Sequence, residues 1–246
     1  MVIFFLTNFG NIISTSFMTG KFENLLVLFL EKTSSFSFLK LSRVLLLVKS
    51  LFTGVQDSKN VKRNKMEKLP IGLYIVSTPI GNLDDISLRA QKILNGVDFI
   101  ICENPIHSLK LLNKFGIKKK LFSLHDYNEE LLIKQIKKYQ LNHSFALISD
   151  AGSPLISDPG YKLVQDYINE DLFITSIPGP SSIISSLQLS GLPINNFKFC
   201  GFVPKNKKDL DITIDNIKYS QTTLVFFISG LRLLAFLEEI IVKKID

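Results

Sequence analysis

The sequence of 246 residues lacks the signatures of metal-bound and disulfide-bonded proteins. Its two cysteines, Cys102 and Cys200, are isolated, have neither CxxC nor CxxH spacing, and are accompanied by only three histidines. These residues match no zinc-binding pattern and provide no disulfide framework. We therefore expect no metal site, and free thiols in a reducing cytoplasm.

Two nucleotide-binding fingerprints are also missing. The chain contains no GxGxxG sequence, which is typical of dinucleotide-binding folds, and no GxxxxGK[ST] sequence, which is typical of nucleoside triphosphate hydrolases. Their absence argues against hydride transfer with a dinucleotide and against nucleotide hydrolysis.

Long apolar runs are absent from the first 65 residues, which differ in composition from the rest of the chain. They hold nine Lys or Arg and three Asp or Glu residues, so most of the formal net charge of +7 lies there. Their uncharged run 2–20 is interrupted by Ser, Thr and Asn, whereas a membrane span needs about 20 predominantly apolar residues. No basic residue precedes this run, as it would in a secretory signal. We expect no stable membrane insertion; attachment to an anionic membrane surface is the competing interpretation.

Composition changes at Met66. Residues 56–68 are charged, contain neither Pro nor Gly, and are typical of a linker. A regular alternation of apolar runs and helical patterns begins directly afterwards. We therefore expect residues 1–68 to be an extension and linker, and the functional unit to begin at Met66.

From residue 69 onward, short apolar runs alternate with patterns of helical spacing. Strands are expected at 73–77, 97–102, 121–124, 145–148, 172–177, 197–203 and 222–228. Helices are expected after a cap at Asp84 or Asp85, and at 109–115, 128–140, 161–170, 183–189, 212–217 and 231–241. Strands that alternate with helices predict an α/β protein with a mostly parallel first sheet and helices on both of its faces.

Three loops rich in Gly and Pro each follow an apolar strand. They are 79–82, 149–160 and 178–182. Because the carboxyl ends of parallel strands meet at one edge of a sheet, these loops predict a ligand site at that edge. The glycines let a ligand approach the backbone, and the prolines restrict rearrangement of the loops. Such a cleft, with few charges, suits a cationic ligand that backbone groups hold.

Four sequence blocks in order resemble those of the ribosomal RNA small subunit methyltransferase I family, which belongs to the tetrapyrrole methylase superfamily. They are 77–83 (STPIGNL), the loop 149–160 (SDAGSPLISDPG), 177–181 (IPGPS) and 201–204 (GFVP). The resemblance implies a two-domain, tetrapyrrole-methylase-like fold. A first α/β domain would span 69–178, and a second domain with a mixed sheet would span 179–246 and be incomplete, because the family has further C-terminal strands.

The resemblance also implies an activity, namely methyl transfer from S-adenosylmethionine to the ribose 2′-hydroxyl of a cytidine in 16S ribosomal RNA. It further implies a cytoplasmic homodimer that works on the small ribosomal subunit without a metal. In-line attack by the hydroxyl depends on positioning, which can supply about 7–11 kcal/mol in well-oriented systems. The cofactor-binding positions carried over are Pro79, Gly81, Asn82, Asp150, Ala151, Gly152, Ser153, Pro178 and Gly179.

Lysines near the fourth block are the expected RNA contacts, since lysine positions phosphates without reading sequence. They are Lys205, Lys207 and Lys208. A lysine run at 118–120 is interpreted as an ordinary solvated surface.

Two motifs depart from the family. Where the family has Glu-Asp-Thr-Arg, this chain has Glu103 followed by Asn-Pro-Ile. Where the family has Tyr-Glu-Ser and then His-Arg, only Ser229 and Arg232 are kept. Glu103, Ser229 and Arg232 are the candidate catalytic residues. Three hypotheses stay open: an RNA 2′-O-methyltransferase, a catalytically inactive remnant that binds S-adenosylmethionine or RNA, and a tetrapyrrole C-methyltransferase.

Overall fold

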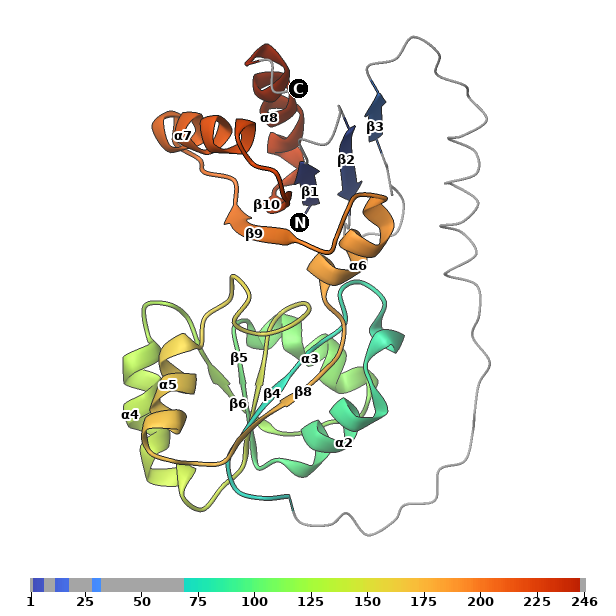
Figure 1. Ribbon diagram of the computed structural model, residues 1–246. Coiled ribbons are helices and arrows are strands. Elements are labelled where there is room, and N and C mark those ends of the chain that lie inside the picture. The colour runs from blue at the N-terminus through green and yellow to red at the C-terminus, as the bar shows by residue number, and fades with distance from the viewer. Residues whose placement is uncertain (1, 7–11, 18–27, 32–68, 244–246) are drawn as a thin grey trace. The chain divides into compact units, whose positions relative to one another are not determined.

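The computed structural model describes residues 2–6, 12–17, 28–31 and 69–243 (Figure 1). The chain divides into two compact units, which we call the continuous unit, residues 66–185, and the discontinuous unit, residues 1–65 together with 186–246. Among the described residues, no helix combines the length and the apolar content that crossing a bilayer requires.

The continuous unit is built on a five-stranded sheet with the order β6-β5-β7-β4-β8. Its strands are β4 (Leu73–Val76), β5 (Phe99–Cys102), β6 (Lys120–Ser123), β7 (Phe145–Ile148) and β8 (Ile174–Ile177). All of its strand pairs are parallel, which confirms the predicted parallel first sheet. Because β4 lies between β7 and β8, the loops that follow these three strands leave the sheet side by side.

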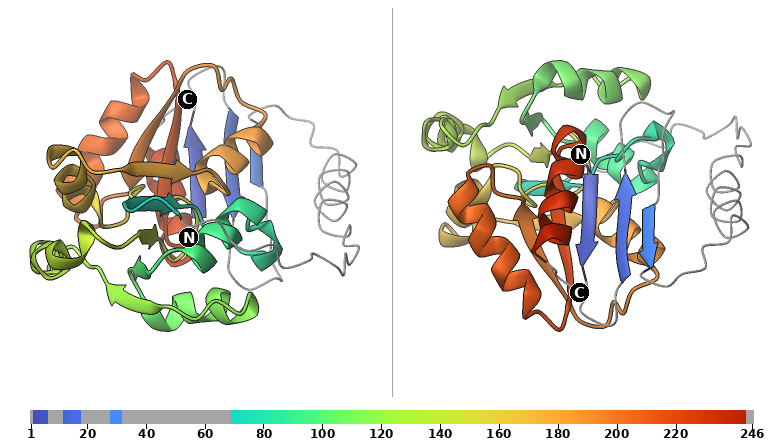
Figure 2. Two further views of the ribbon diagram at one scale, coloured as in Figure 1. Left: turned by 90° about the horizontal axis from the view of Figure 1, so that it is seen from below. Right: turned by 90° about the horizontal axis from the view of Figure 1, so that it is seen from above.

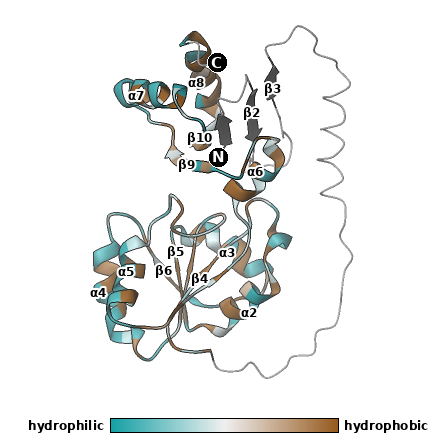
Figure 3. Ribbon diagram, viewed as in Figure 1, coloured by the Kyte–Doolittle hydropathy of each residue, from teal (hydrophilic) through white to brown (hydrophobic). Residues whose placement is uncertain are grey.

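Helices cover both faces of this sheet, as Figure 1 shows. The helices are α2 (Leu88–Gly96), α3 (Pro105–Lys114), α4 (Glu129–Gln140) and α5 (Tyr161–Asn169). Ile100 packs in a core with residues of α2 and α3, whereas its neighbour Ile101 packs in a second core with residues of α4 and α5. Successive strand residues thus point to opposite faces, and both faces are buried. Figure 3 shows the corresponding brown, hydrophobic colour along these strands.

Three local expectations for the continuous unit were wrong. The cap of α2 is Ser87, whose hydroxyl accepts a hydrogen bond from Ala90 N, while Asp84 and Asp85 lie in the short 3-10 helix η1 (Leu83–Asp85). Helix α3 begins at Pro105 instead of residue 109, because Asn104 caps it and proline fits the first helical position. Helical spacing over 128–140 places Leu131 on one face with Leu132 and Ile136, yet Leu131 is 68% exposed whereas these two are buried.

The discontinuous unit holds a mixed sheet with the order β3-β2-β1-β10-β9. Strands β9 (Phe197–Phe202) and β10 (Thr223–Ile228) pair in parallel. Strand β1 (Val2–Leu6) pairs antiparallel with β10, from Val2 opposite Ile228 to Leu6 opposite Leu224. Strands β2 (Ile12–Phe17) and β3 (Leu28–Glu31) continue the antiparallel part, and Figure 2 shows the three side by side. The predicted mixed second sheet is confirmed.

Three helices complete the described elements. Helix α6 (Ser182–Ser190) spans the division between the units, whereas α7 (Lys207–Lys218) and α8 (Gly230–Val242) belong to the discontinuous unit. The buried side chains of α7 and α8 pack with Leu224, Phe226 and Ile228 of β10. Strands β1–β3 come from the segment expected to be an extension, and the domain boundaries at 68/69 and 178/179 stay a prediction.

Candidate cofactor-binding site

Hydrogen bonds join the loops after β4 and β7. Thr78 N donates to Gly152 O at 2.8 Å, and Gly152 N donates to Thr78 O at 3.0 Å. The Thr78 hydroxyl donates to Ser149 O at 3.1 Å. Thr78 and Gly152 are both buried, so these bonds are shielded from water. The two loops therefore form one rigid element.

The loop after β8 joins the same cluster. The Ser77 and Ser153 hydroxyl oxygens lie 3.1 Å apart, and the Ser153 hydroxyl donates to Pro180 O at 3.4 Å. A Cβ atom added at Gly179 would lie 2.9 Å from the Ser77 Cβ. Glycine at 179 is thus what lets the third loop approach the first this closely.

The predicted cofactor positions lie along these three loops with different exposure. Pro79 and Gly152 are buried, Asn82, Asp150 and Ser153 are half-buried, and Gly81, Ala151, Pro178 and Gly179 are exposed. The Asn82 side chain accepts a hydrogen bond from Asp84 N and caps η1. An added Cβ at Gly81 would meet no atom within 4 Å, so open space borders this position.

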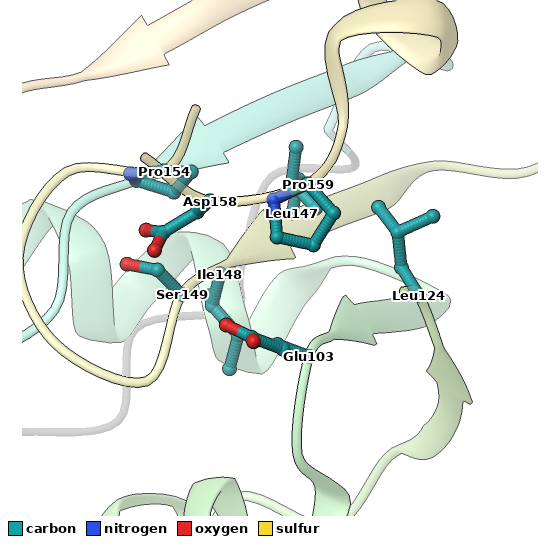
Figure 4. Close-up of a pocket in the computed structure, with 8 residues that line it drawn as sticks. All are labelled: Glu103, Leu124, Leu147, Ile148, Ser149, Pro154, Asp158 and Pro159. Carbon is teal, nitrogen blue, oxygen red and sulfur yellow. The ribbon is translucent and has the colours of Figure 1, made fainter. Parts of the chain in front are cut away.

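Carboxyl groups gather at the neighbouring strand ends (Figure 4). Glu103, Ser149 and Asp158 line a small hollow together with Leu124, Leu147, Ile148, Pro154 and Pro159. Burial, helped by the charges of Glu103 and Asp150, raises the pKa of Asp158 to about 6. Burial and the charge of Asp150 also raise the pKa of Glu103. The sequence analysis included Asp158 in the central loop but did not select it; its signal was the Asp-Pro-Gly sequence that ends that loop.

Asp150 tests whether the loops fit a cationic cofactor. Its Oδ2 atom lies 3.3 Å from His107 Nδ1, whereas its Oδ1 atom is buried and has no hydrogen-bond partner among the described residues. A buried carboxylate oxygen without a partner costs free energy, and a cationic ligand would satisfy it. The open space at Gly81 and this free oxygen both fit S-adenosylmethionine, which carries sulfonium and ammonium groups. In the part of the chain that the structure describes, no cluster of three or more His, Cys, Asp or Glu side chains is placed to hold a metal ion.

The remaining predicted residues belong to the discontinuous unit. Ser229 is exposed and precedes α8, with no hydrogen bond from its side chain that caps the helix. The Arg232 guanidinium donates to the carbonyl oxygens of Val203 and Pro204. Lys207 pairs with Glu239 at 2.9 Å and with Asp211 at 3.6 Å. Lys205 and Lys208 are exposed.

The raised pKa of Asp158 predicts a specific dependence of stability on pH. A carboxyl that keeps its proton to about pH 6 when folded, but loses it near pH 4 when unfolded, stabilises the fold at low pH. That contribution disappears as the pH rises from about 4 to about 6. Asp158→Asn should therefore gain melting temperature relative to the wild type across this window, measured by thermal melts at several pH values.

Asp98→Asn is the control, because its effect on stability should depend on pH in the opposite direction. Burial acts to raise the pKa of Asp98, but hydrogen bonds from Ser144 N at 2.7 Å and Ser144 Oγ at 2.9 Å outweigh it, and the pKa is lowered. This variant should be less stable than the wild type at neutral pH, with the difference shrinking below about pH 4. A constant difference between Asp158→Asn and the wild type at every pH would contradict the assignment.

Parallel strands whose carboxyl-end loops are joined in this way define an α/β protein with a ligand site at one edge of its sheet, and comparison with known proteins gives its family. The family described as Tetrapyrrole (Corrin/Porphyrin) Methylases matches residues 72–245. The chain therefore belongs to the tetrapyrrole methylase family. A crystal structure of diphthine synthase shares the fold, with a TM-score of 0.51, 16% identity and coverage of 64% of each chain.

Several curated relatives carry the same name. The chain is 43% identical over 170 residues to "Ribosomal RNA small subunit methyltransferase I" of Escherichia coli O157:H7, covering 69% of this chain and 59% of the relative. It is 47% identical over 173 residues to the protein of the same name from Rickettsia prowazekii (strain Madrid E), covering 68% and 60%. These relatives confirm the resemblance that the four sequence blocks indicate. The chain spans about three fifths of the length of these two relatives.

Proposed function

We propose that this chain is an S-adenosylmethionine-dependent methyltransferase that modifies the ribose 2′-hydroxyl of a cytidine in 16S ribosomal RNA. The observation that carries the proposal is the joined cluster of three loops in a chain that is 43–47% identical to proteins named ribosomal RNA small subunit methyltransferase I. A cytoplasmic homodimer that acts on the small ribosomal subunit is part of the same proposal.

The three joined loops would hold the cofactor. The residues concerned are Pro79, Gly81, Asn82, Asp150, Ala151, Gly152, Ser153, Pro178 and Gly179. Bound there, S-adenosylmethionine supplies an electrophilic methyl group. The chain contributes a preformed backbone surface, because the bonds between Thr78 and Gly152 fix the loops before binding. The free Oδ1 atom of Asp150 offers a partner to a positively charged group of the ligand.

Glu103 is the proposed proton acceptor. The hydroxyl oxygen would bond to the methyl carbon as the carbon–sulfur bond breaks, with its electron pair leaving on the sulfur. The hydroxyl would lose its proton in the same step, and a carboxylate can take up that proton. Burial raises the pKa of Glu103, which makes its ionised form a stronger base than an ordinary exposed carboxylate. The neighbouring Asp158, whose pKa is about 6, holds a proton more readily and so limits the negative charge gathered in the hollow.

The test has two parts, both on the full chain. Calorimetric titration with S-adenosylmethionine should show saturable binding, and labelled methyl groups should appear on 16S RNA of small ribosomal subunits. Glu103→Gln should keep the cofactor Kd and lower kcat by roughly 100-fold or more, the usual range for a lost general base. Binding without methyl transfer to any acceptor would support the inactive remnant, and methylation of a porphyrinogen but not of RNA would support a tetrapyrrole C-methyltransferase.

A further inference from the structure

A β-bulge near the end of β9 redirects the strand's last aromatic side chain. Pairing with β10 runs from Thr223 opposite Phe197 to Val225 opposite Phe199, then shifts so that Phe227 is opposite Phe202. One extra β9 residue is accommodated there, next to Gly201, whose φ of +70° lies in the left-handed region that favours glycine.

The bulge has a direct consequence for Phe202. Residues three apart on a regular strand point to opposite faces, yet the rings of Phe199 and Phe202 both contact Phe227, with centroids 4.8 and 5.4 Å away. The Phe202 ring is therefore held edge-on against a buried ring while it stays 58% exposed. An exposed, fixed aromatic ring is the kind of surface on which an unpaired base stacks.

Basic side chains follow directly along the chain. Lys205 and Lys208 are exposed and have no ion pair with any residue that the structure describes. Lys207 differs, because Glu239 and Asp211 neutralise it and it links α7 to α8. An exposed aromatic ring that is followed three and six residues later by two unneutralised lysines is complementary to single-stranded RNA, which offers bases and phosphates.

Arg232 holds the loop that carries Lys205 and leads into α7, whose second residue is Lys208. It lies in the first turn of α8, where a cation is unfavourable for the helix dipole, so its position needs another reason. Its guanidinium donates to Val203 O at 3.0 Å and also to Pro204 O, while Val203 N donates to Phe227 O at 2.9 Å. Val203, the residue before the loop, is thus held by hydrogen bonds at both its N–H and its C=O group. At the other end of the loop, Asn206 caps α7 by accepting a hydrogen bond from Asp209 N at 2.8 Å.

We propose that Phe202, Lys205 and Lys208 form a binding surface for a single-stranded RNA segment. An unpaired base stacks on Phe202, and flanking phosphates contact the two lysines. Arg232 is a positioning residue that keeps the loop containing Lys205, and the start of α7 that follows it, in the binding conformation, which lowers the entropy cost of binding. This inference rests on the proposed function and adds the form of RNA that the site takes.

The experiment measures the affinity of the full chain for a fluorescein-labelled single-stranded oligoribonucleotide as a function of salt. Phe202→Leu, which keeps the apolar volume but removes the aromatic face, should weaken binding about tenfold, within the range known for base stacking. Lys205→Ala combined with Lys208→Ala should reduce the slope of log K against log salt by roughly 1.4, or about 0.7 for each phosphate contact. Lys118→Ala, an exposed lysine of the continuous unit, is the control and should change neither quantity.

Arg232→Met separates positioning from direct contact. It should lower the affinity several-fold with an unchanged salt slope and an unchanged cofactor Kd, and Arg232→Lys should recover part of the loss. A slope reduced by about 0.7 would make Arg232 a phosphate contact and overturn its positioning role.

The experiments distinguish an error in the proposed RNA-binding surface from an error in the proposed methyltransferase function. If the wild type methylates RNA and all variants bind the oligoribonucleotide as the wild type does, the surface is wrong and the function stands. If the wild type neither binds nor methylates RNA, both are wrong. Melting curves for each variant confirm that it is folded.

Discussion

Gly152→Val should abolish binding of S-adenosylmethionine. Gly152 has a φ of +86°, and an added Cβ would lie 3.3 Å from Ile80 Cγ2 and 3.8 Å from Pro180 O. Its N–H and C=O both bond to Thr78, so a shift to relieve strain would separate two of the loops proposed to hold the cofactor. Calorimetric titration of the variant should give no measurable heat of binding.

Gly116→Val is the matched control for this variant. Gly116 also lies in the continuous unit with a positive φ, +65°, but an added Cβ would meet nothing within 4 Å. It should suffer the same kind of backbone strain, about 1–2 kcal/mol, and still bind the cofactor normally. Gly179→Ala tests the close approach of the loop after β8 to the loop after β4, since its Cβ would lie 2.9 Å from the Ser77 Cβ. Normal affinity in both Gly152→Val and Gly179→Ala would place the cofactor elsewhere.

A chain that begins at Met66 should lose the stability of the discontinuous unit. Removing β1 leaves the edge of β10 unpaired over the five positions from Leu224 to Ile228. All six residues of β10 are buried, and an exposed apolar strand edge promotes aggregation. Differential scanning calorimetry should show the melting of this unit lowered by more than about 10 °C, or lost to aggregation, because 1 kcal/mol corresponds to about 4–8 °C in a small domain. The transition of the continuous unit should remain.

Phe4→Pro examines the same contact in the full-length chain. Strand β1 lies between β2 and β10, so a proline at this position removes a hydrogen bond from one ladder or the other. This substitution should lower the same transition by a smaller amount. If the chain from Met66 melted like the full chain, the first 65 residues would be the dispensable extension that their composition predicts.

Local sequence signals predicted the continuous unit well. Its strands are short apolar runs bounded by Gly and Pro, and the structure places all five within a residue or two of the predicted ranges. The errors came from competing local signals. Asn104 and Pro105 are strong start signals that extend α3 beyond its apolar pattern, and Ser87 caps α2 in place of the acidic residues before it.

Strands β1–β3 could not be predicted in the same way. Ser and Thr interrupt the apolar residues of β2, and β10, the strand with which β1 pairs, lies near the other end of the chain. Strand pairing of this kind depends on non-local contacts that no window of sequence contains.

The candidate site was predicted in outline. The order of strands brings together the loops that were selected for their Gly and Pro content. The individual cofactor-binding positions in them were predicted from the resemblance to known methyltransferases. The pairs that join them were missed, namely Thr78 with Gly152 and Ser77 with Ser153, because side-chain and backbone partners across loops depend on strand order. Asp158 was missed as well, since its raised pKa arises first from burial and then from the charges of Glu103 and Asp150, and all three depend on how distant segments fold together.

The pairing of β1 with β10 also bears on how the chain folds during synthesis. Residues 66–185 form a unit from one uninterrupted segment, so this part can fold while the ribosome is still making the rest. Strand β1 is made long before its partner β10, and the two can pair only after β10 has emerged. Until then β1–β3 have only one another, and small isolated sheets are marginally stable in water. The late closing of this sheet is therefore the step at which a nascent chain is most open to chaperones and to misassembly.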